Sequence, residues 1–145
     1  MDLFRHLLRF LPALLWMAVI YRTSATPGLK SVPLVQGVGL LPAHLDPAAM
    51  QLLELLLRKS AHLFSYGLLA VLLGWAFFPW LDRRRSFWAA LVVTVLFAIS
   101  DEYHQSFVPN REGRWYDVAI DTVGAVLGLL LLRPRRQPTR SPCNP

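Results

Sequence analysis

Cysteine and charge are both scarce in this sequence, and each shortage excludes a class of protein. The single cysteine, Cys143, allows no internal disulfide and no cysteine cluster that would hold a metal. Only 17% of the 145 residues are Asp, Glu, Lys or Arg, whereas 54% are hydrophobic, a balance typical of a membrane protein. Alternation of apolar and polar residues at strand spacing is also missing, so we expect an all-α chain.

Long apolar runs take the place of the missing charge. They cover residues 7–20, 61–80, 87–99 and 118–132. A membrane-spanning helix needs about 20 mainly apolar residues, which the second run supplies alone and the others reach with flanking polar residues. We therefore predict a polytopic bundle of four transmembrane helices. A soluble helical bundle is the alternative, but residues 63–80 are apolar on every side of the helix.

Basic residues predict the orientation of these helices. Nine of the 15 Lys and Arg residues flank the two termini or the turn after the second run, and six flank the opposite helix ends. Cytoplasmic flanks carry the excess of basic residues, so both termini are predicted to be cytoplasmic. Alternatively, the first run is a signal peptide, with Arg5 and Arg9 as its basic region and residues 23–25 as its cleavage site.

The net charge of +6 follows from this placement of arginine. No nucleic-acid binding motif accompanies the arginines, so nucleic acid is not expected as a partner. Residues 134–145 are rich in proline and arginine and are predicted to form a disordered cytoplasmic tail that touches anionic lipid. Residues 1–133 are then one membrane domain, with the lipid bilayer as its partner.

The connection between the first two spans contains several helix breakers. Three prolines and several glycines predict an external loop over residues 21–44. Asp46 and Pro47 then have the residue types of a helix N-cap and a first helical position. Residues 48–58 are predicted to form a surface helix that bends into the second span. The alternative is one long helix that projects from the membrane.

The polar segment SDEYHQSFVPNREGRWYDVAID, residues 100–121, lies between two of the most apolar runs. It is predicted to contain the external end of the third helix, a loop and the start of the fourth helix. The second helix begins on the same side with RKSAHLFSY, residues 58–66. Three helices therefore bring polar side chains to the same depth of the membrane, near its outer face.

Helical spacing predicts which of these side chains meet. One face of the second helix carries Lys59, His62 and Tyr66, at positions i, i+3 and i+7. One stripe of the fourth helix carries Asp117, Asp121, Gly124 and Gly128. Glycines let a neighbouring membrane helix approach closely, which would put the two carboxylates at that contact.

Acids at this depth need partners. On the third helix, Asp101 can face His104 and Gln105, and Glu102 points toward Gln105. Asp121 precedes Leu132 by eleven positions, about 17 Å of helix, and so lies well inside a hydrocarbon core of about 30 Å. An unpaired acid there costs at least about 2.5 kcal/mol. Its candidate partners are Lys59, His62, Arg111 and Arg114.

The leading prediction is an outward-facing pocket that binds a lipid-linked or cell-wall-related ligand. Its predicted lining is Lys59, His62, Tyr66, Glu102, Gln105, Arg111, Asp117 and Asp121. Lys59, Arg111 and Arg114 would contact an anionic head group, for which arginine supplies bidentate hydrogen bonds. Alternatively, the same groups form a structural ion network that holds the helices together.

An enzyme and a transporter are further alternatives. In the enzyme, His62 or His104 would be the general base and Glu102 or Asp117 the acid, although no nucleophile motif surrounds the nearby serines. In a small proton-coupled transporter, Asp121 and His62 would relay protons in a homo-oligomer formed through the glycines.

A metal site is not predicted. Its candidate ligands would be His62, His104, Glu102 and Asp117, but no spacing among them matches a known metal motif. No other cofactor is expected either.

Two segments resemble the signatures of VanZ-like membrane proteins. RKSAHLFSYGLL is similar to the family's Lys-x-x-His-x-x-x-Tyr pattern, and SDEYHQSFVPNREGRWYDVAIDTVGAVLG is similar to its second signature. The matching positions, including those in the segment TSATP, are Ser24, Pro27, Lys59, His62, Tyr66, Glu102, Gln105, Pro109, Arg111, Asp117, Gly124 and Gly128. Asp121 departs from the pattern, because the family usually has Asn there.

The resemblance implies a multi-pass protein of the bacterial inner membrane. The family's named member is associated with resistance to teicoplanin, a glycopeptide that binds cell-wall precursors. Such a phenotype does not transfer with the fold alone, because function resides in sites.

Overall fold

The computed structural model describes residues 2–26, 31–37, 39, 46–109 and 113–132, and every regular element in these ranges is an α-helix. The helices are α1 (Asp2–Leu8), α2 (Leu11–Ser24), α3 (Ser31–Gly37), α4 (Pro47–Phe77), α5 (Arg83–Gln105) and α6 (Trp115–Leu131). The predicted all-α class is thus confirmed for the described part of the chain. The predicted tail, residues 134–145, lies outside it.

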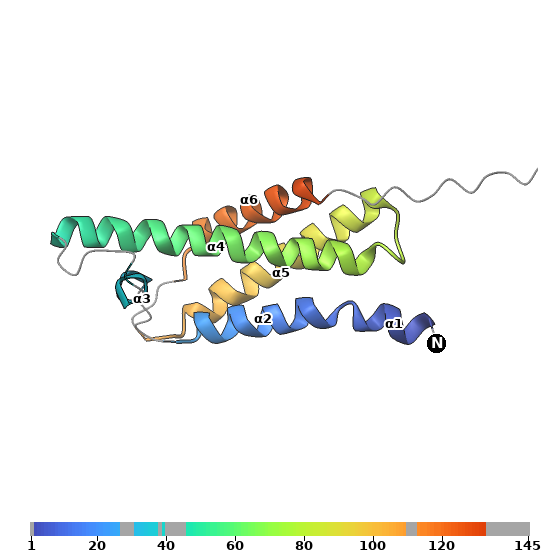
Figure 1. Ribbon diagram of the computed structural model, residues 1–145, viewed down its shortest axis with the longest axis horizontal. Coiled ribbons are helices and arrows are strands. Elements are labelled where there is room, and N and C mark those ends of the chain that lie inside the picture. The colour runs from blue at the N-terminus through green and yellow to red at the C-terminus, as the bar shows by residue number, and fades with distance from the viewer. Residues whose placement is uncertain (1, 27–30, 38, 40–45, 110–112, 133–145) are drawn as a thin grey trace, which may run out of the picture.

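The helices α2, α4, α5 and α6 run alongside one another and alternate in direction (Figure 1). α1 continues the line of α2 after a short break, and Pro12 occupies the first turn of α2, where no helical N–H partner is needed. α4 packs most extensively on α6, and α5 contacts both of them. α4, α5 and α6 therefore form the close-packed unit, with α2 laid against it.

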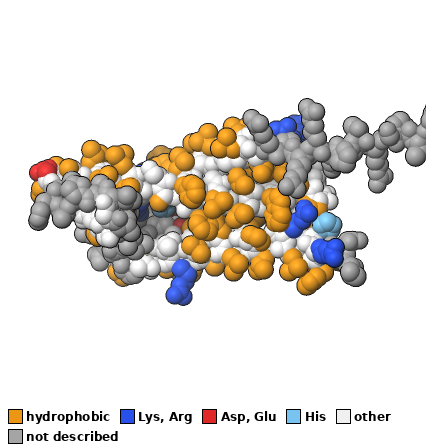
Figure 2. Space-filling model, in the orientation of Figure 1, with side chains coloured by type: hydrophobic (Ala, Val, Ile, Leu, Met, Phe, Trp, Pro, Cys, Tyr) orange, Lys and Arg blue, Asp and Glu red, His pale blue; other side chains and the backbone are white. Residues whose placement is uncertain are grey.

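In the described part of the chain, three helical stretches are long and apolar enough to cross a membrane: Leu3–Ser24, Pro47–Phe77 and Arg83–Gln105. Hydrophobic side chains cover the middle of the face drawn in Figure 2, and Lys and Arg side chains lie toward its two ends. α6 has 17 residues, which corresponds to about 26 Å of helix. The predicted fourth crossing, by α6, stays a prediction.

The helix α4 begins as its sequence predicts but extends further than expected. Asp46 caps it by accepting hydrogen bonds from the N–H groups of Ala48 and Ala49, at 3.0 and 3.3 Å. The helix then continues for 31 residues, so the prediction of a separate surface helix at residues 48–58 is wrong.

Packing explains why α4 stays a single helix. Between Pro47 and Gly67 it contains neither proline nor glycine, and it is rich in leucine, which favours helix. α3 lies within the predicted loop and packs on the first part of α4. There the Val32 N–H donates to a carboxylate oxygen of Glu54 at 2.8 Å, and the Val32 side chain is buried. The projecting part of α4 thus has a partner of its own.

Glycines set the distance between α4 and α6. A Cβ atom at Gly124 would collide with the main-chain carbonyl of Leu63, and one at Gly128 would collide with that of Gly67. A Cβ at Gly67 would in turn lie 3.0 Å from the carbonyl oxygen of Gly124. The two helix backbones therefore touch at these positions, as small residues allow in membrane proteins.

Candidate functional site

The functional candidates lie at one end of the bundle, where α2 and α5 end, α6 begins and the middle of α4 passes (Figure 1). We call them the polar cluster, which consists of Ser24, Lys59, His62, Tyr66, Asp101, Glu102, Gln105, Asp117 and Asp121. Its four acids are buried, with at most 6% of each residue exposed. Buried carboxylates are expensive unless they are paired or hydrogen-bonded, so their partners define what the site can do.

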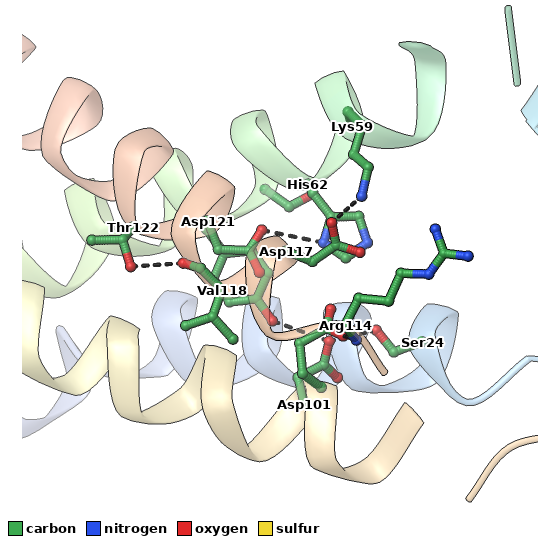
Figure 3. A network of polar contacts seen from close by, with 12 residues as sticks. Ser24, Lys59, His62, Asp101, Arg114, Asp117, Val118, Asp121 and Thr122 are labelled. Carbon is green, nitrogen blue, oxygen red and sulfur yellow. Dashed lines mark hydrogen bonds and ion pairs between the residues drawn. The ribbon is translucent and has the colours of Figure 1, made fainter. Parts of the chain in front are cut away.

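One face of α4 supplies a partner to three of these acids. Lys59 forms an ion pair with Asp117, and His62 Nδ1 lies 3.2 Å from Asp121 Oδ1 (Figure 3). One turn further, the Tyr66 hydroxyl donates to Asp101 Oδ2 at 3.0 Å. These contacts follow from the spacing of the three residues along α4, which aims all three side chains at the junction of α5 and α6.

Asp101 holds three helices together. Its Oδ2 atom accepts hydrogen bonds from Ser24 Oγ of α2 at 2.8 Å, from Tyr66 of α4 and from Gln105 Nε2 of α5 at 2.9 Å. All three donors are neutral and buried. This arrangement ties α2 to the close-packed unit through a single carboxylate oxygen.

The sequence prediction omitted both Asp101 and Ser24 from the site. A signal for Asp101 was its position four residues before Gln105, on the same face of one helix. Ser24 carried no signal from spacing, because its contact depends on how α2 is rotated against α5, and its match to the family's pattern was the sign that could have pointed to it.

Glu102 links the end of α5 to the start of α6. Its Oε2 atom accepts from the backbone N–H of Arg114 at 2.8 Å, just where α6 begins. A carboxylate at that place is also favoured by the positive end of the helix dipole. Among the described residues, its Oε1 atom has one long contact, 3.5 Å from Gln105 Nε2. A Cβ atom at Gly113 would collide with the carbonyl oxygen of Glu102, so this turn requires glycine.

The polar cluster has more buried acceptors than described donors. Among the described residues, one carboxylate oxygen of each of Asp101, Asp117 and Asp121 is buried without a hydrogen-bond partner. Within the cluster, as far as the described residues go, Lys59 forms an ion pair with Asp117, and His62 contacts Asp121 in a pair that is ionic when the imidazole is protonated. The site therefore has unused capacity to bind a proton, a metal ion or the donor of a ligand.

The side chains of two other predicted residues, His104 and Arg114, lie outside the polar cluster. His104 contacts Tyr21 of α2, with the two rings stacked at 4.5 Å and His104 Nδ1 placed 3.5 Å from the tyrosine hydroxyl. The Arg114 guanidinium reaches the Tyr116 hydroxyl at the surface. Arg111 lies outside the described residues. Of the two candidate histidines, His62 is the one that the structure brings to the acids.

A cavity opens beside the polar cluster. It has a volume of about 430 Å³ and lies between the end of α5 and the start of α6, lined by Ile99, Glu102, Tyr103, Ser106, Gly113, Trp115 and Val118. Among the described residues of this lining, Glu102 is the charged one, and it also belongs to the polar cluster. A molecule in the cavity would thus meet apolar and aromatic walls and, at Glu102, the edge of the buried acids.

Long apolar helices around a buried acidic cluster define an integral membrane protein. A sequence model of the VanZ/LLP1 family matches residues 9–136. The chain therefore belongs to the VanZ/LLP1 family of membrane proteins. No curated protein and no solved structure matches it.

Proposed function

We propose that the protein binds an amphiphilic envelope ligand, such as a lipid or a lipid-linked cell-wall precursor, in the cavity between α5 and α6. The observation that carries this proposal is the composition of the cavity as the described residues show it: apolar walls from Ile99, Val118 and Trp115, with the carboxylate of Glu102 among them. Acyl chains favour such walls, and a polar head group needs a hydrogen-bonding end. In this proposal the cavity faces the outer side of the bacterial inner membrane and both termini are cytoplasmic.

The head group should carry hydrogen-bond donors. Lys59 is already paired with Asp117, so its charge is offset within the protein. Glu102, in contrast, lines the cavity, and its Oε1 atom has among the described residues one long contact, 3.5 Å from Gln105 Nε2. An ammonium or hydroxyl group would satisfy that oxygen better than a bare phosphate would. If the ligand is a precursor to which teicoplanin binds, occupancy of this cavity would also alter teicoplanin susceptibility.

Filling the cavity tests the proposal. Val118→Trp, on α6, should displace the ligand, whereas Val123→Trp places the same ring on a half-exposed position of α6 outside the cavity. Wild type and both variants would be purified in mild detergent, and bound lipids identified by native mass spectrometry. We expect at least about a tenfold loss of bound lipid for Val118→Trp and none for Val123→Trp.

A second variant that fills the cavity controls for misfolding of Val118→Trp. Ile99→Trp reaches the same space from α5. Melting temperatures in detergent identify variants that fold. Retention of the wild-type lipid by a folded Val118→Trp or Ile99→Trp variant would contradict binding in this cavity.

One observation favours an enzyme as a second candidate. His62 is oriented by Asp121, and suitable ligand atoms of His62, Asp121 and Glu102 lie within 4.8 Å of one another. A histidine held by a carboxylate beside another carboxyl group is a common acid–base arrangement. Wild type and His62→Ala would be incubated in vesicles of bacterial lipid extract, and the lipids analysed by mass spectrometry. A product that forms only with wild type would support catalysis, and identical lipids in both samples would count against it.

A further inference from the structure

We propose that His62, Glu102 and Asp121 bind a divalent transition-metal ion of the Zn²⁺ or Mn²⁺ type. The sequence alone predicts no metal, because these residues come from three different helices and follow no linear motif. The inference shares Glu102 with the lipid proposal, but it rests on the donor atoms of the polar cluster and not on the apolar walls of the cavity.

The first support is the distance between donor atoms. One ligand atom from each of the three residues lies within 4.8 Å of the other two. Metal–ligand bonds of about 2.1 Å place neighbouring donors about 3.0–3.4 Å apart and opposite donors about 4.2 Å apart. The 3.2 Å separation of His62 Nδ1 and Asp121 Oδ1 already falls in this range. Side-chain adjustments of about half an ångström would bring the Glu102 oxygen within bonding distance of the same metal ion.

The second support is an unused atom at the deepest acid. Asp121 is fully buried, with 0% of the residue exposed, and its Oδ2 atom has no hydrogen-bond partner among the described residues. Asp121 directs its other oxygen at His62, as Figure 3 shows. A buried carboxylate with a vacant oxygen is costly, and a cation at this position would satisfy both the charge and the lone pairs.

The donor types select the class of metal. One imidazole nitrogen and two carboxylates suit Zn²⁺, Mn²⁺ or Fe²⁺, whereas Mg²⁺ and Ca²⁺ prefer oxygen donors throughout. The surroundings also fit, because the Arg114 N–H holds Glu102 in place and the ion pair of Lys59 and Asp117 lies one turn above. Glu102 lines the cavity, so a coordination position left open by the protein could be reached from there by water or by a ligand.

A proton is the rival occupant. Protonated His62 beside ionised Asp121, with neutral Glu102, would satisfy the same three groups without any metal. The two occupants differ in one measurable respect, which is the stoichiometry of bound metal after removal and controlled readdition.

The test uses the full chain, purified in detergent and stripped with a chelator. Samples would be dialysed against Zn²⁺, Mn²⁺ or Mg²⁺, and bound metal measured by inductively coupled plasma mass spectrometry. We expect about one Zn²⁺ or Mn²⁺ per chain and little Mg²⁺. Asp121→Asn removes the charge at nearly constant shape and should weaken binding at least about 100-fold, as should His62→Gln. Asp82→Asn makes the same change at an exposed acid outside the cluster and should bind like wild type.

Wild type alone also answers the question if the variants fail to fold. Stripped wild type titrated with Co²⁺ should develop the visible absorption of cobalt bound by nitrogen and oxygen donors, and excess Zn²⁺ should abolish it. Less than about one metal per ten chains in every sample, or no cobalt absorption, would overturn the proposal in favour of the proton. Folded Asp121→Asn protein that binds Zn²⁺ like wild type would overturn it as well.

Discussion

Asp101 and Asp121 are both buried acids at the same end of the bundle, yet their surroundings differ in kind. One oxygen of Asp101 accepts hydrogen bonds from three neutral donors on three helices. Asp121 contacts one ionisable partner, His62, and belongs to a group of potential metal ligands. Hydroxyl and amide donors that are neutral at physiological pH fix a geometry, whereas an imidazole can exchange its proton for a metal. We therefore call the contacts of Asp101 the structural tie, because they hold the helices in place, whereas the surroundings of Asp121 can still accept a proton, a metal ion or a ligand.

The largest effect is expected at the structural tie. Asp101→Ala would leave the buried donors of Ser24, Tyr66 and Gln105 without their acceptor, at about 1–3 kcal/mol each. We expect the free energy of unfolding to fall by about 4 kcal/mol and the amount of protein in the membrane to drop. Asp121→Ala removes one such contact and should cost clearly less. Equal melting temperatures of the two variants in detergent would remove the distinction between the two acids.

An intermediate effect is expected where the helix backbones touch. Gly124→Ala would press a Cβ atom against the Leu63 carbonyl and force α6 away from α4, at a cost of about 1–3 kcal/mol. Because Asp121 is on α6 and His62 on α4, their contact should loosen, whereas the Asp101 contacts to α2, α4 and α5 do not involve α6. Gly37→Ala is the matched control, since nothing lies within 4 Å of its added Cβ. Melting temperatures in detergent check this, and a Gly124→Ala variant as stable as Gly37→Ala would contradict it.

The smallest effects are expected when one α4 side chain loses its contact with Asp101 or with Asp121. Tyr66→Phe deletes a hydrogen bond to Asp101 inside the protein and should cost about 1–2 kcal/mol. His62→Gln keeps a polar group near Asp121 and should cost less than about 1 kcal/mol, while it weakens the proposed metal binding. The free energy of unfolding of Tyr66→Phe and of His62→Gln, measured with and without Zn²⁺, distinguishes the two variants. A His62→Gln variant that is less stable than Tyr66→Phe without metal would assign His62 a structural role.

Spacing along single helices predicted a substantial part of the site. The face with Lys59, His62 and Tyr66 and the stripe with Asp117 and Asp121 each belong to one helix, so their relative directions follow from helical geometry alone. The structure brings this face and this stripe together, because Gly124 and Gly128, which follow Asp121 on the same stripe, let the backbones of α6 and α4 touch.

The rotation of α5 could not be predicted in the same way. Asp101, Glu102 and Gln105 turn inward and are buried, while His104 turns toward Tyr21. Nothing within residues 100–105 distinguishes these faces, since polar side chains surround the whole turn. The rotation is set by donors on other helices, such as Ser24 and Tyr66, which are far away in the sequence. The continuity of α4 across residues 48–58 was mispredicted for a similar reason, because its partner α3 lies in a segment rich in helix breakers.

The unbroken length of α4 has a mechanical consequence. Its 31 residues correspond to about 46 Å, so the rod exceeds a hydrocarbon core of about 30 Å even when tilted. α3 contacts the first part of α4 through the hydrogen bond from Val32 to Glu54. Lys59 and His62 lie further along the same helix. A force applied at α3 would therefore tilt α4 as a lever and change the distances from Lys59 and His62 to their acids on α6.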